Sequence, residues 1–246
     1  MTIEQDRDAY IPGFAYYGDN ILLLKATLEQ IVRRTREMSS IRLLSLGVGH
    51  RFVVKGLLDS LGDRLSRHVI IEGSAEIIDL FNQEMAPPAK LELVQSFFED
   101  FHTDERFDVI EMGFILEHVE DPGLVLQRFK SFLAPGGRMM IAVPNAFSLH
   151  RLIGQRAGLM DDLHSLSEAD RALGHRRYFD PAQLDALISA AGLDIIGRAG
   201  LMLKPFTTGQ MDSLQLSDKV REAMDQIGFD LPDICNGLFV EARPCR

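Results

Sequence analysis

The sequence predicts an α/β protein built around one doubly wound, largely parallel sheet. Short apolar segments alternate along the chain with longer segments of helical periodicity. The 246 residues are 46% hydrophobic, which is enough to bury a sizeable core, and no internal repeat or low-complexity linker divides them. Because repeated strand–helix–strand units favour right-handed crossovers, we expect a single domain with one continuous sheet.

The predicted strands are brief and apolar, as expected of parallel strands that are buried on both faces. Two further strands are expected near the C-terminus. The segments, in chain order, are residues 41–46, 69–71, 91–94, 109–112 and 139–143, followed by 193–197 and 238–242.

The predicted helices lie before, between and after these strands. A leading helix is expected at residues 20–34, and others at 52–61, 75–81, 122–133 and 181–191. Two of them have clear start signals: Asp121 can cap a helix that carries Pro122 in its first turn, and Asp180 can cap the last helix. The segment APGG at 134–137 is expected to end the helix at 122–133 and turn into the next strand.

The composition excludes several classes of function. A net charge of −10 argues against a surface that grips nucleic acid, so small molecules are the expected partners. The two cysteines, Cys235 and Cys245, have no metal-ligand spacing and cannot form a disulfide framework. The acidic N-terminus has no apolar signal region, and no stretch approaches the length of a membrane span. A cytoplasmic protein without membrane contact is expected.

A glycine-containing loop follows the first predicted strand, in LLSLGVGHRF at 43–52. Gly47 and Gly49 allow a tight turn that brings main-chain N–H groups against a ligand. Glu72 ends the second strand, where a carboxylate can accept hydrogen bonds from both hydroxyls of a ribose. Phe52 occupies the position of the third glycine in the dinucleotide fingerprint, so a pyrophosphate seat is not expected. The alternative is a tight turn with an incidental surface acid.

A longer motif series resembles a known family. The segment FDVIEMGFILEHVEDPGLVLQRFKSFLAPGGRMMIAVPN at 107–145 resembles the class I S-adenosylmethionine-dependent methyltransferases, most closely the small-molecule O- and N-methyltransferases of the ubiquinone-biosynthesis type. The resemblance covers 41–145, with a weaker continuation to the C-terminus. It implies a Rossmann-like sheet of seven strands, five parallel and two in a C-terminal antiparallel hairpin, with a helical cover insertion.

The resemblance also implies a division of labour within one domain at 1–246. Residues 1–40 would form an N-terminal lid and helix, 41–145 the cofactor-binding core, 146–180 the substrate cover, and 181–246 the last helix and strands. S-adenosylmethionine is the implied cofactor, with S-adenosylhomocysteine as its product. The implied cofactor-binding residues are Tyr17 in the lid; Gly47, Val48, Gly49 and His50 around the methionine portion; Glu72, Gly73 and Ser74 at the ribose; Ser96, Phe97 and Phe98 at the adenine; and Met112, Gly113 and Phe114 facing the sulfonium.

Alternatives remain for several of these residues. The aromatic pair Phe97 and Phe98 could be ordinary core, and Tyr17 could serve in core packing. Ser45 stands where the family carries an acid near the end of the first strand, so the cofactor's ammonium group must be held by the backbone or by another side chain. Arg51 follows His50 where a third glycine is common; these two side chains could pair with the cofactor's carboxylate, narrow the pocket or point to solvent.

Three histidines are candidates for the general base that removes a proton from a hydroxyl or amine acceptor. The unperturbed pKa of histidine lies near neutrality, as such a base requires. His118 follows the fourth strand, His150 follows the fifth, and His175 lies in the cover insertion. Structural roles are the alternatives: His118 could orient its loop together with Glu117, and His150 could pack under the cover.

The cover insertion is rich in arginine although the chain as a whole is acidic. An acceptor that carries a carboxylate or phosphate is one explanation; solvated helix faces paired with nearby acids are the other. The residues concerned are Arg151, Arg156, Arg171, Arg176 and Arg177.

These observations predict an enzyme that moves a methyl group to an O or N atom of a small-molecule biosynthetic intermediate. No metal site is predicted, and a homodimer is compatible with the prediction. A non-catalytic or regulatory binding protein on the same scaffold is the first alternative, because of Ser45 and Arg51. An NAD-dependent oxidoreductase is the second, although Phe52 argues against it.

Overall fold

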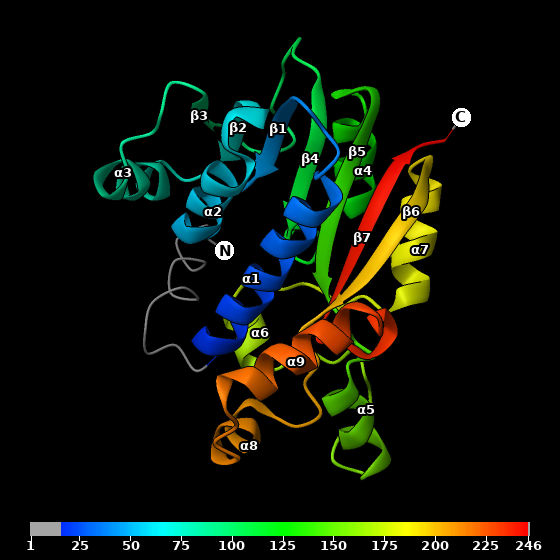
Figure 1. The fold of residues 1–246 in the computed structure, drawn as a ribbon. Coiled ribbons are helices and arrows are strands. Elements are labelled where there is room, and N and C mark those ends of the chain that lie inside the picture. The colour runs from blue at the N-terminus through cyan, green and yellow to red at the C-terminus, as the bar shows by residue number, and fades with distance from the viewer. Residues whose placement is uncertain (1–15, 246) are drawn as a thin grey trace.

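One seven-stranded sheet forms the centre of the computed structural model, which describes residues 16–245 (Figure 1). The strand order is β3-β2-β1-β4-β5-β7-β6. Strands β1 to β5 pair in parallel, whereas β7 runs antiparallel to both of its neighbours, β5 and β6. The predicted α/β fold is therefore confirmed. The strands are β1 Ile41–Leu46, β2 Leu65–Glu72, β3 Leu91–Gln95, β4 Phe107–Gly113, β5 Leu133–Pro144, β6 Leu193–Leu201 and β7 Gly237–Pro244.

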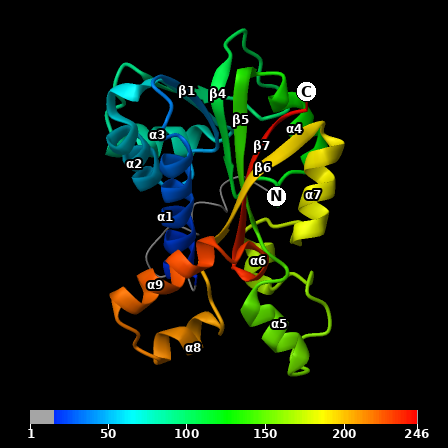
Figure 2. The ribbon, with the colours of Figure 1, turned by 45° about the vertical axis from the view of Figure 1, so that its right-hand side comes forward.

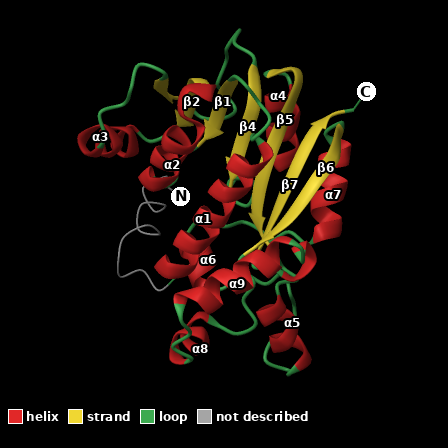
Figure 3. Ribbon diagram, viewed as in Figure 1, coloured by secondary structure: helices red, strands yellow, loops and turns green. Residues whose placement is uncertain are grey.

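Helices cover both faces of this sheet, as a doubly wound fold requires. Figure 2 shows α1 and α2 on one side and α4 and α7 on the other, and Figure 3 shows further helices grouped beyond one end of the strands. The helices are α1 Tyr17–Arg34, α2 Arg51–Leu61, α3 Ala75–Glu84, α4 Pro122–Lys130, α5 Leu149–Arg156, α6 Glu168–Ala172, α7 Pro181–Ala190, α8 Thr208–Ser213 and α9 Asp218–Phe229, with short 3-10 turns at Gly62–Arg64 and Pro232–Ile234.

Two apolar layers hold the helices to the sheet. Leu126 and Phe129 of α4 pack with Leu184 of α7 on one face, and all three side chains are fully buried. Ile31 of α1 and Leu57 of α2 belong to a separate cluster on the opposite face. Burying apolar surface on both faces explains why the parallel strands read as short, continuous apolar runs.

Several predicted elements are longer in the structure, β2, β5 and β6 among them, and one helix end is corrected. Helix α4 ends at Lys130 instead of residue 133, and β5 already begins at Leu133, so the APGG segment lies within that strand. Gly136 has a φ of 79°, and a Cβ at Gly137 would lie 2.8 Å from the carbonyl oxygen of Phe107. The strand pairing is irregular here, with Phe107 opposite Leu133 before a shift in register. The glycines thus permit a close backbone approach at the start of β5, not a helix end.

The C-terminal strands pair as predicted, but the chain between them was not anticipated. Residues 202–236 carry α8 and α9, which pack near the lower end of the sheet in Figure 1. Within residues 16–245, no helix has the length and apolar character needed to cross a bilayer. The proposed division of the chain into lid, core, cover and C-terminal part stays a prediction, and residues 1–15 of the lid lie outside the described residues.

Candidate functional site

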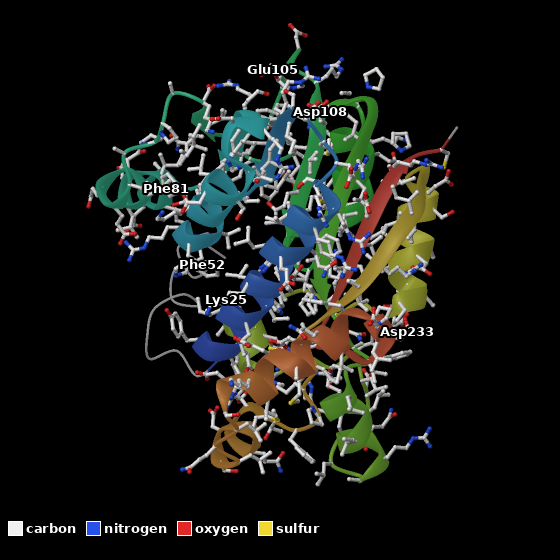
Figure 4. The ribbon with its side chains drawn as sticks, viewed as in Figure 1. Lys25, Phe52, Phe81, Glu105, Asp108 and Asp233 are labelled. Atoms are coloured by element: carbon white, nitrogen blue, oxygen red, sulfur yellow. The ribbon has the colours of Figure 1, made fainter. Side chains whose placement is uncertain are left out.

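A cavity of about 1180 Å³ opens where the parallel strands end. Its walls come from the loops after β1, β2, β3 and β4, from α1, and from the insertion between β5 and α7. Figure 4 shows Phe52 at the lower end of α2, whereas Glu105 and Asp108 lie at the top of the view, near the start of β4. Ligands of open α/β sheets bind at this edge, beyond the carboxyl ends of the strands.

The loop after β1 contributes backbone to this cavity. Gly47 and Gly49 have φ values of 78° and 56°, a region that residues with a Cβ rarely adopt. At Gly47 a Cβ would also lie 3.3 Å from Cδ1 of Ile115. The loop is fixed by a hydrogen bond from the Val48 N–H to Oε2 of Glu72, at 3.1 Å. The glycines therefore bring main-chain groups to the cavity.

Glu72 is held in place by the backbone on both sides. Its other oxygen, Oε1, accepts a hydrogen bond from the N–H of Ser74 at 3.0 Å, and the residue is only 7% exposed. Each carboxylate oxygen can accept more than one hydrogen bond, so both can still accept from hydroxyl groups in the cavity. Ser74 itself does not line the cavity; its side chain accepts from the N–H of Ile77 and caps α3.

The two aromatic residues after β3 divide between cavity and core. Phe97 lines the cavity and is 55% exposed, which is unusual for so large an apolar ring. Phe98 also reaches the cavity, but it packs against the core and contacts the ring of Phe129 edge-on, with the ring centroids 6.4 Å apart. Phe97 is thus the side chain available to stack on a flat ligand.

The remaining predicted cofactor-binding residues occupy different positions around the cavity. Met112 is fully buried in the core and does not line the cavity. Phe114 comes directly after β4 and has a φ of 59°, which is a strained backbone conformation for an aromatic residue. His50 caps α2 by accepting the N–H of Phe52 at 3.2 Å. The predicted residues that line the cavity are Tyr17, Gly47, Val48, Gly49, His50, Glu72, Gly73, Ser96, Phe97, Phe98, Gly113 and Phe114.

All three candidate histidines line the same cavity. The rings of His118 and His175 are perpendicular, with centroids 4.7 Å apart. Nδ1 of His175 lies 3.5 Å from Oδ1 of Asp170, which also accepts a hydrogen bond from the Tyr178 hydroxyl at 3.0 Å. The structure therefore brings together two histidines that are far apart in the sequence.

The environments of these groups differ in ways that affect proton transfer. Burial lowers the pKa of His118 to about 3, and the neighbouring His175 adds to this shift. Burial also lowers the pKa of His150 to about 3, assisted by Lys204 and Arg151. For Asp170, burial alone would raise the pKa, but hydrogen bonds from His175 and Ser167 hold it well below its ordinary value. An ionised Asp170 can thus orient His175 and stabilise its protonated form.

A cluster in the same wall could hold a metal ion. The ligand atoms of Glu117, His118 and His175 all lie within 4.8 Å of one another. Carboxylate oxygen and imidazole nitrogen are both ligands of divalent cations. This cluster was not predicted from the sequence, because the third member comes from a segment remote from the other two.

The arginines of the insertion have different partners. Arg151 donates to the carbonyl oxygens of Leu163 and Ser165 and lies over the ring of Tyr178, so it is a structural element of the insertion. Arg177 donates to the carbonyl of Glu120. Arg176 is exposed and lines the cavity, whereas Arg156 and Arg171 do not line it.

Several polar residues in the cavity wall were not predicted from the sequence. Lys204 forms a 2.6 Å ion pair with Asp19 of α1, and Tyr178 bonds Asp170. Glu111 is a carboxylate within the buried strand β4. An acid inside an apolar strand is a signal that can be seen in the sequence, whereas the Lys204–Asp19 pair depends on tertiary contacts.

Comparison with known proteins places these features in context. A model of the methyltransferase domain family matches residues 22–197. The ubiquinone biosynthesis O-methyltransferase of Azorhizobium caulinodans is 27% identical over 179 residues, which cover 70% of this chain and 66% of that protein. The enzyme of the same name from Nitrobacter winogradskyi is 30% identical over 69% of this chain and 62% of its own. The chain thus matches somewhat less than two thirds of the length of these relatives.

Solved structures share the fold at low sequence identity. A 1,6-didemethyltoxoflavin-N1-methyltransferase from Burkholderia thailandensis, bound to 1,6-didemethyltoxoflavin and S-adenosylhomocysteine, has a TM-score of 0.62 at 16% identity, covering 99% of this chain and 87% of that one. The N-methyltransferase NodS from Bradyrhizobium japonicum, in complex with S-adenosylhomocysteine, has a TM-score of 0.55 at 14% identity, covering 99% and 97%.

Proposed function

Because the chain belongs to the S-adenosylmethionine-dependent methyltransferases, we propose that it moves a methyl group to an oxygen or nitrogen atom of a small-molecule biosynthetic intermediate. The observation that carries this proposal is a single cavity lined both by Glu72, which is bonded to the glycine-containing loop after β1, and by the His175–Asp170 pair. One part suits a nucleoside, and the other suits removal of a proton from an acceptor.

The cavity residues that follow β1, β2 and β3 fit the methyl donor, S-adenosylmethionine. The buried carboxylate of Glu72 can accept from two ribose hydroxyls, and Phe97 can lie against the adenine. The backbone at Gly47 and Gly49 can approach the methionine portion closely. When bound, S-adenosylmethionine supplies an electrophilic methyl group on a positively charged sulfur.

His175 is the general base that the geometry favours. It lines the cavity, and the ionised Asp170 lies 3.5 Å from Nδ1 of its ring and can orient it. His118 and His150 are neutral at pH 7 but bind a proton weakly, since burial lowers the pKa of both to about 3. A base with so low a pKa gains little by accepting a proton from a hydroxyl.

Transfer of a labelled methyl group tests the proposal. The protein is incubated with methyl-labelled S-adenosylmethionine and a panel of phenols, catechols and amines, each with and without a carboxylate. We expect label on an oxygen or nitrogen atom of at least one class of acceptor, identified by mass spectrometry. Tight binding of S-adenosylhomocysteine without transfer to any member would favour the non-catalytic alternative, and stabilisation by NADH instead would favour an oxidoreductase.

Substitution Phe97→Ala tests the adenine contact. We expect about 5- to 10-fold weaker binding of S-adenosylhomocysteine, because an aromatic contact contributes on the order of 1 kcal/mol beyond its burial. Thermal stability should hardly change, since Phe97 is 55% exposed. The matched substitution Phe98→Ala should lower the melting temperature instead, because Phe98 packs on the core. Unchanged affinity in Phe97→Ala would remove the stacking role; both readouts come from calorimetry.

Substitution Arg176→Ala tests whether the acceptor is anionic. Arg176 is exposed in the cavity wall, so we expect KM for a carboxylate-bearing acceptor to rise about 10-fold while KM for the donor stays constant. Arg156→Ala is the control, because Arg156 is an exposed residue of α5 that does not line the cavity. An unchanged acceptor KM in Arg176→Ala would exclude an anionic acceptor held by this side chain.

A further inference from the structure

Strand β4 places a buried carboxylate beside the loop that follows β1. Glu111 pairs across the sheet with Ser45, two residues before Gly47. It is 9% exposed and yet lines the cavity. Its Oε1 lies against the backbone of Gly113, since a Cβ there would be only 2.5 Å from that oxygen. The carboxylate therefore extends along β4 toward the carboxyl end of the sheet.

The neighbours of Glu111 donate hydrogen bonds to it but bring no positive charge. The hydroxyl of Ser45 and the backbone N–H of Gly113 both bond to the carboxylate. Ser45 lies 3.0 Å from Nε2 of His68, which is fully buried and has its pKa lowered by burial to about 3, so this ring is neutral at pH 7. Thr27 of α1, also near Gly113, uses its hydroxyl to bond the carbonyl of Leu23.

This arrangement lacks a counter-ion. Within residues 16–245, no Lys, Arg or His forms an ion pair with Glu111, and no other charged group contributes to the shift of its pKa. Burial raises that pKa to about 7, although the hydrogen bonds from Ser45 and Gly113 oppose the shift. An ionised carboxylate in such a place is costly unless a cation accompanies it. Because Glu111 faces the cavity, a ligand can supply that cation.

We propose that Glu111 binds the ammonium group on the methionine portion of S-adenosylmethionine, in the role that an acid at the end of β1 would have if Ser45 were not there. The inference rests on the proposed function, because it requires that donor. In this chain the acid stands on β4, on the strand next to β1, and Ser45 supports it with a hydrogen bond. His68 in turn holds Ser45.

Proton release on binding follows from this role. At pH 7 Glu111 is about half protonated in the free protein, since its pKa is about 7. A bound ammonium keeps the carboxylate ionised, so binding should release about half a proton at this pH. Below the pKa the proton must be removed before the ammonium can be bound. The Kd should therefore rise about tenfold as the pH falls from 8 to 6.

Calorimetric titration with S-adenosylhomocysteine tests the proposal. In Glu111→Gln we expect a 10- to 100-fold higher Kd, since a charged hydrogen bond is lost, together with no proton release and no dependence on pH between 6 and 8. Proton release is obtained from the difference between the binding enthalpies measured in phosphate and in Tris buffer. This measurement can be made on the unsubstituted protein alone. Glu92→Gln is the control, because Glu92 is a carboxylate of β3 paired with Arg67 outside the cavity.

A second ligand separates the ammonium contact from general damage to the pocket. The compound 5′-methylthioadenosine has the adenosine and the sulfur but no amino-acid portion, so its Kd should be the same in Glu111→Gln as in the unsubstituted protein. Equal loss of both ligands, equal S-adenosylhomocysteine affinity in the two proteins, or no proton release by the unsubstituted protein would overturn the role of Glu111. Failure of the unsubstituted protein to bind S-adenosylhomocysteine at all would overturn the proposed function as well.

Discussion

The variant Glu72→Gln is expected to bind S-adenosylmethionine and S-adenosylhomocysteine about 100-fold more weakly. Both carboxylate oxygens already accept backbone N–H groups, from Val48 and Ser74. The amide nitrogen of glutamine cannot accept a hydrogen bond, so one buried N–H loses its partner and one ribose hydroxyl meets a donor instead of an acceptor. The lost backbone hydrogen bond weakens the loop in the free protein as well, so only the ribose contact acts fully on Kd; at up to about 3 kcal/mol, that one loss accounts for a change of about 100-fold. Isothermal titration calorimetry measures the Kd of each ligand directly.

The control for this variant is Glu84→Gln. Glu84 also lines the cavity, but it forms an exposed ion pair with Arg51. Exposed pairs contribute at most about 1 kcal/mol, so the Kd should change by less than about fivefold. If Glu72→Gln kept the affinity of the unsubstituted protein, or if both variants lost it equally, the carboxylate at the end of β2 would not be the ribose ligand.

Removal of the His175 side chain is expected to produce the largest loss of turnover. Positioned general bases contribute about 10²- to 10⁴-fold, so kcat of His175→Ala should fall within that range. The Kd of S-adenosylhomocysteine should stay within about threefold, because the proposed ribose and adenine contacts lie elsewhere in the cavity. The measurement is steady-state kinetics on the best acceptor of the panel, combined with calorimetry. Asp170→Asn should also lower kcat, since Asp170 orients the ring.

Two controls keep this result interpretable. His102→Ala should be active, because His102 contacts Arg128 outside the cavity. Treatment with a chelator distinguishes the base from a metal ligand, since His175 shares a potential metal cluster with Glu117 and His118. Loss of turnover on chelation, restored by a divalent cation, would reassign His175 to metal binding. Full activity of His175→Ala without metal dependence would exclude both roles.

The fold could be predicted from the sequence because burial on both faces of a parallel sheet leaves short apolar runs. The segments around residues 41–46 and 109–112 correspond to β1 and β4. Boundaries were less predictable where glycine serves a backbone contact: Gly137 passes close to the Phe107 carbonyl inside β5, which no local pattern indicates. The helices α8 and α9 were not predicted, although the sequence carries signals for both. Thr207 and Gln210 form a capping box at the start of α8, and Val220, Met224 and Ile227 recur at helical spacing in α9.

The candidate site was predictable wherever a residue follows a strand end. Gly47, Gly49 and Glu72 converge because parallel strands finish at one edge of the sheet. Met112 shows the limit of this reasoning, because side chains alternate along a strand and its own side chain points into the core. The His175–Asp170 pair and the contact between His118 and His175 depend on how the insertion folds back over the sheet. Sequence spacing alone contains no such information.

A crystal structure with bound S-adenosylhomocysteine tests the central claim most directly. We expect both ribose hydroxyls within hydrogen-bond distance of the Glu72 carboxylate, the adenine against Phe97, and the sulfur facing the side of the cavity that contains His175. A ligand bound elsewhere, or one whose ribose does not contact Glu72, would contradict the account of this cavity as the methyl-donor site.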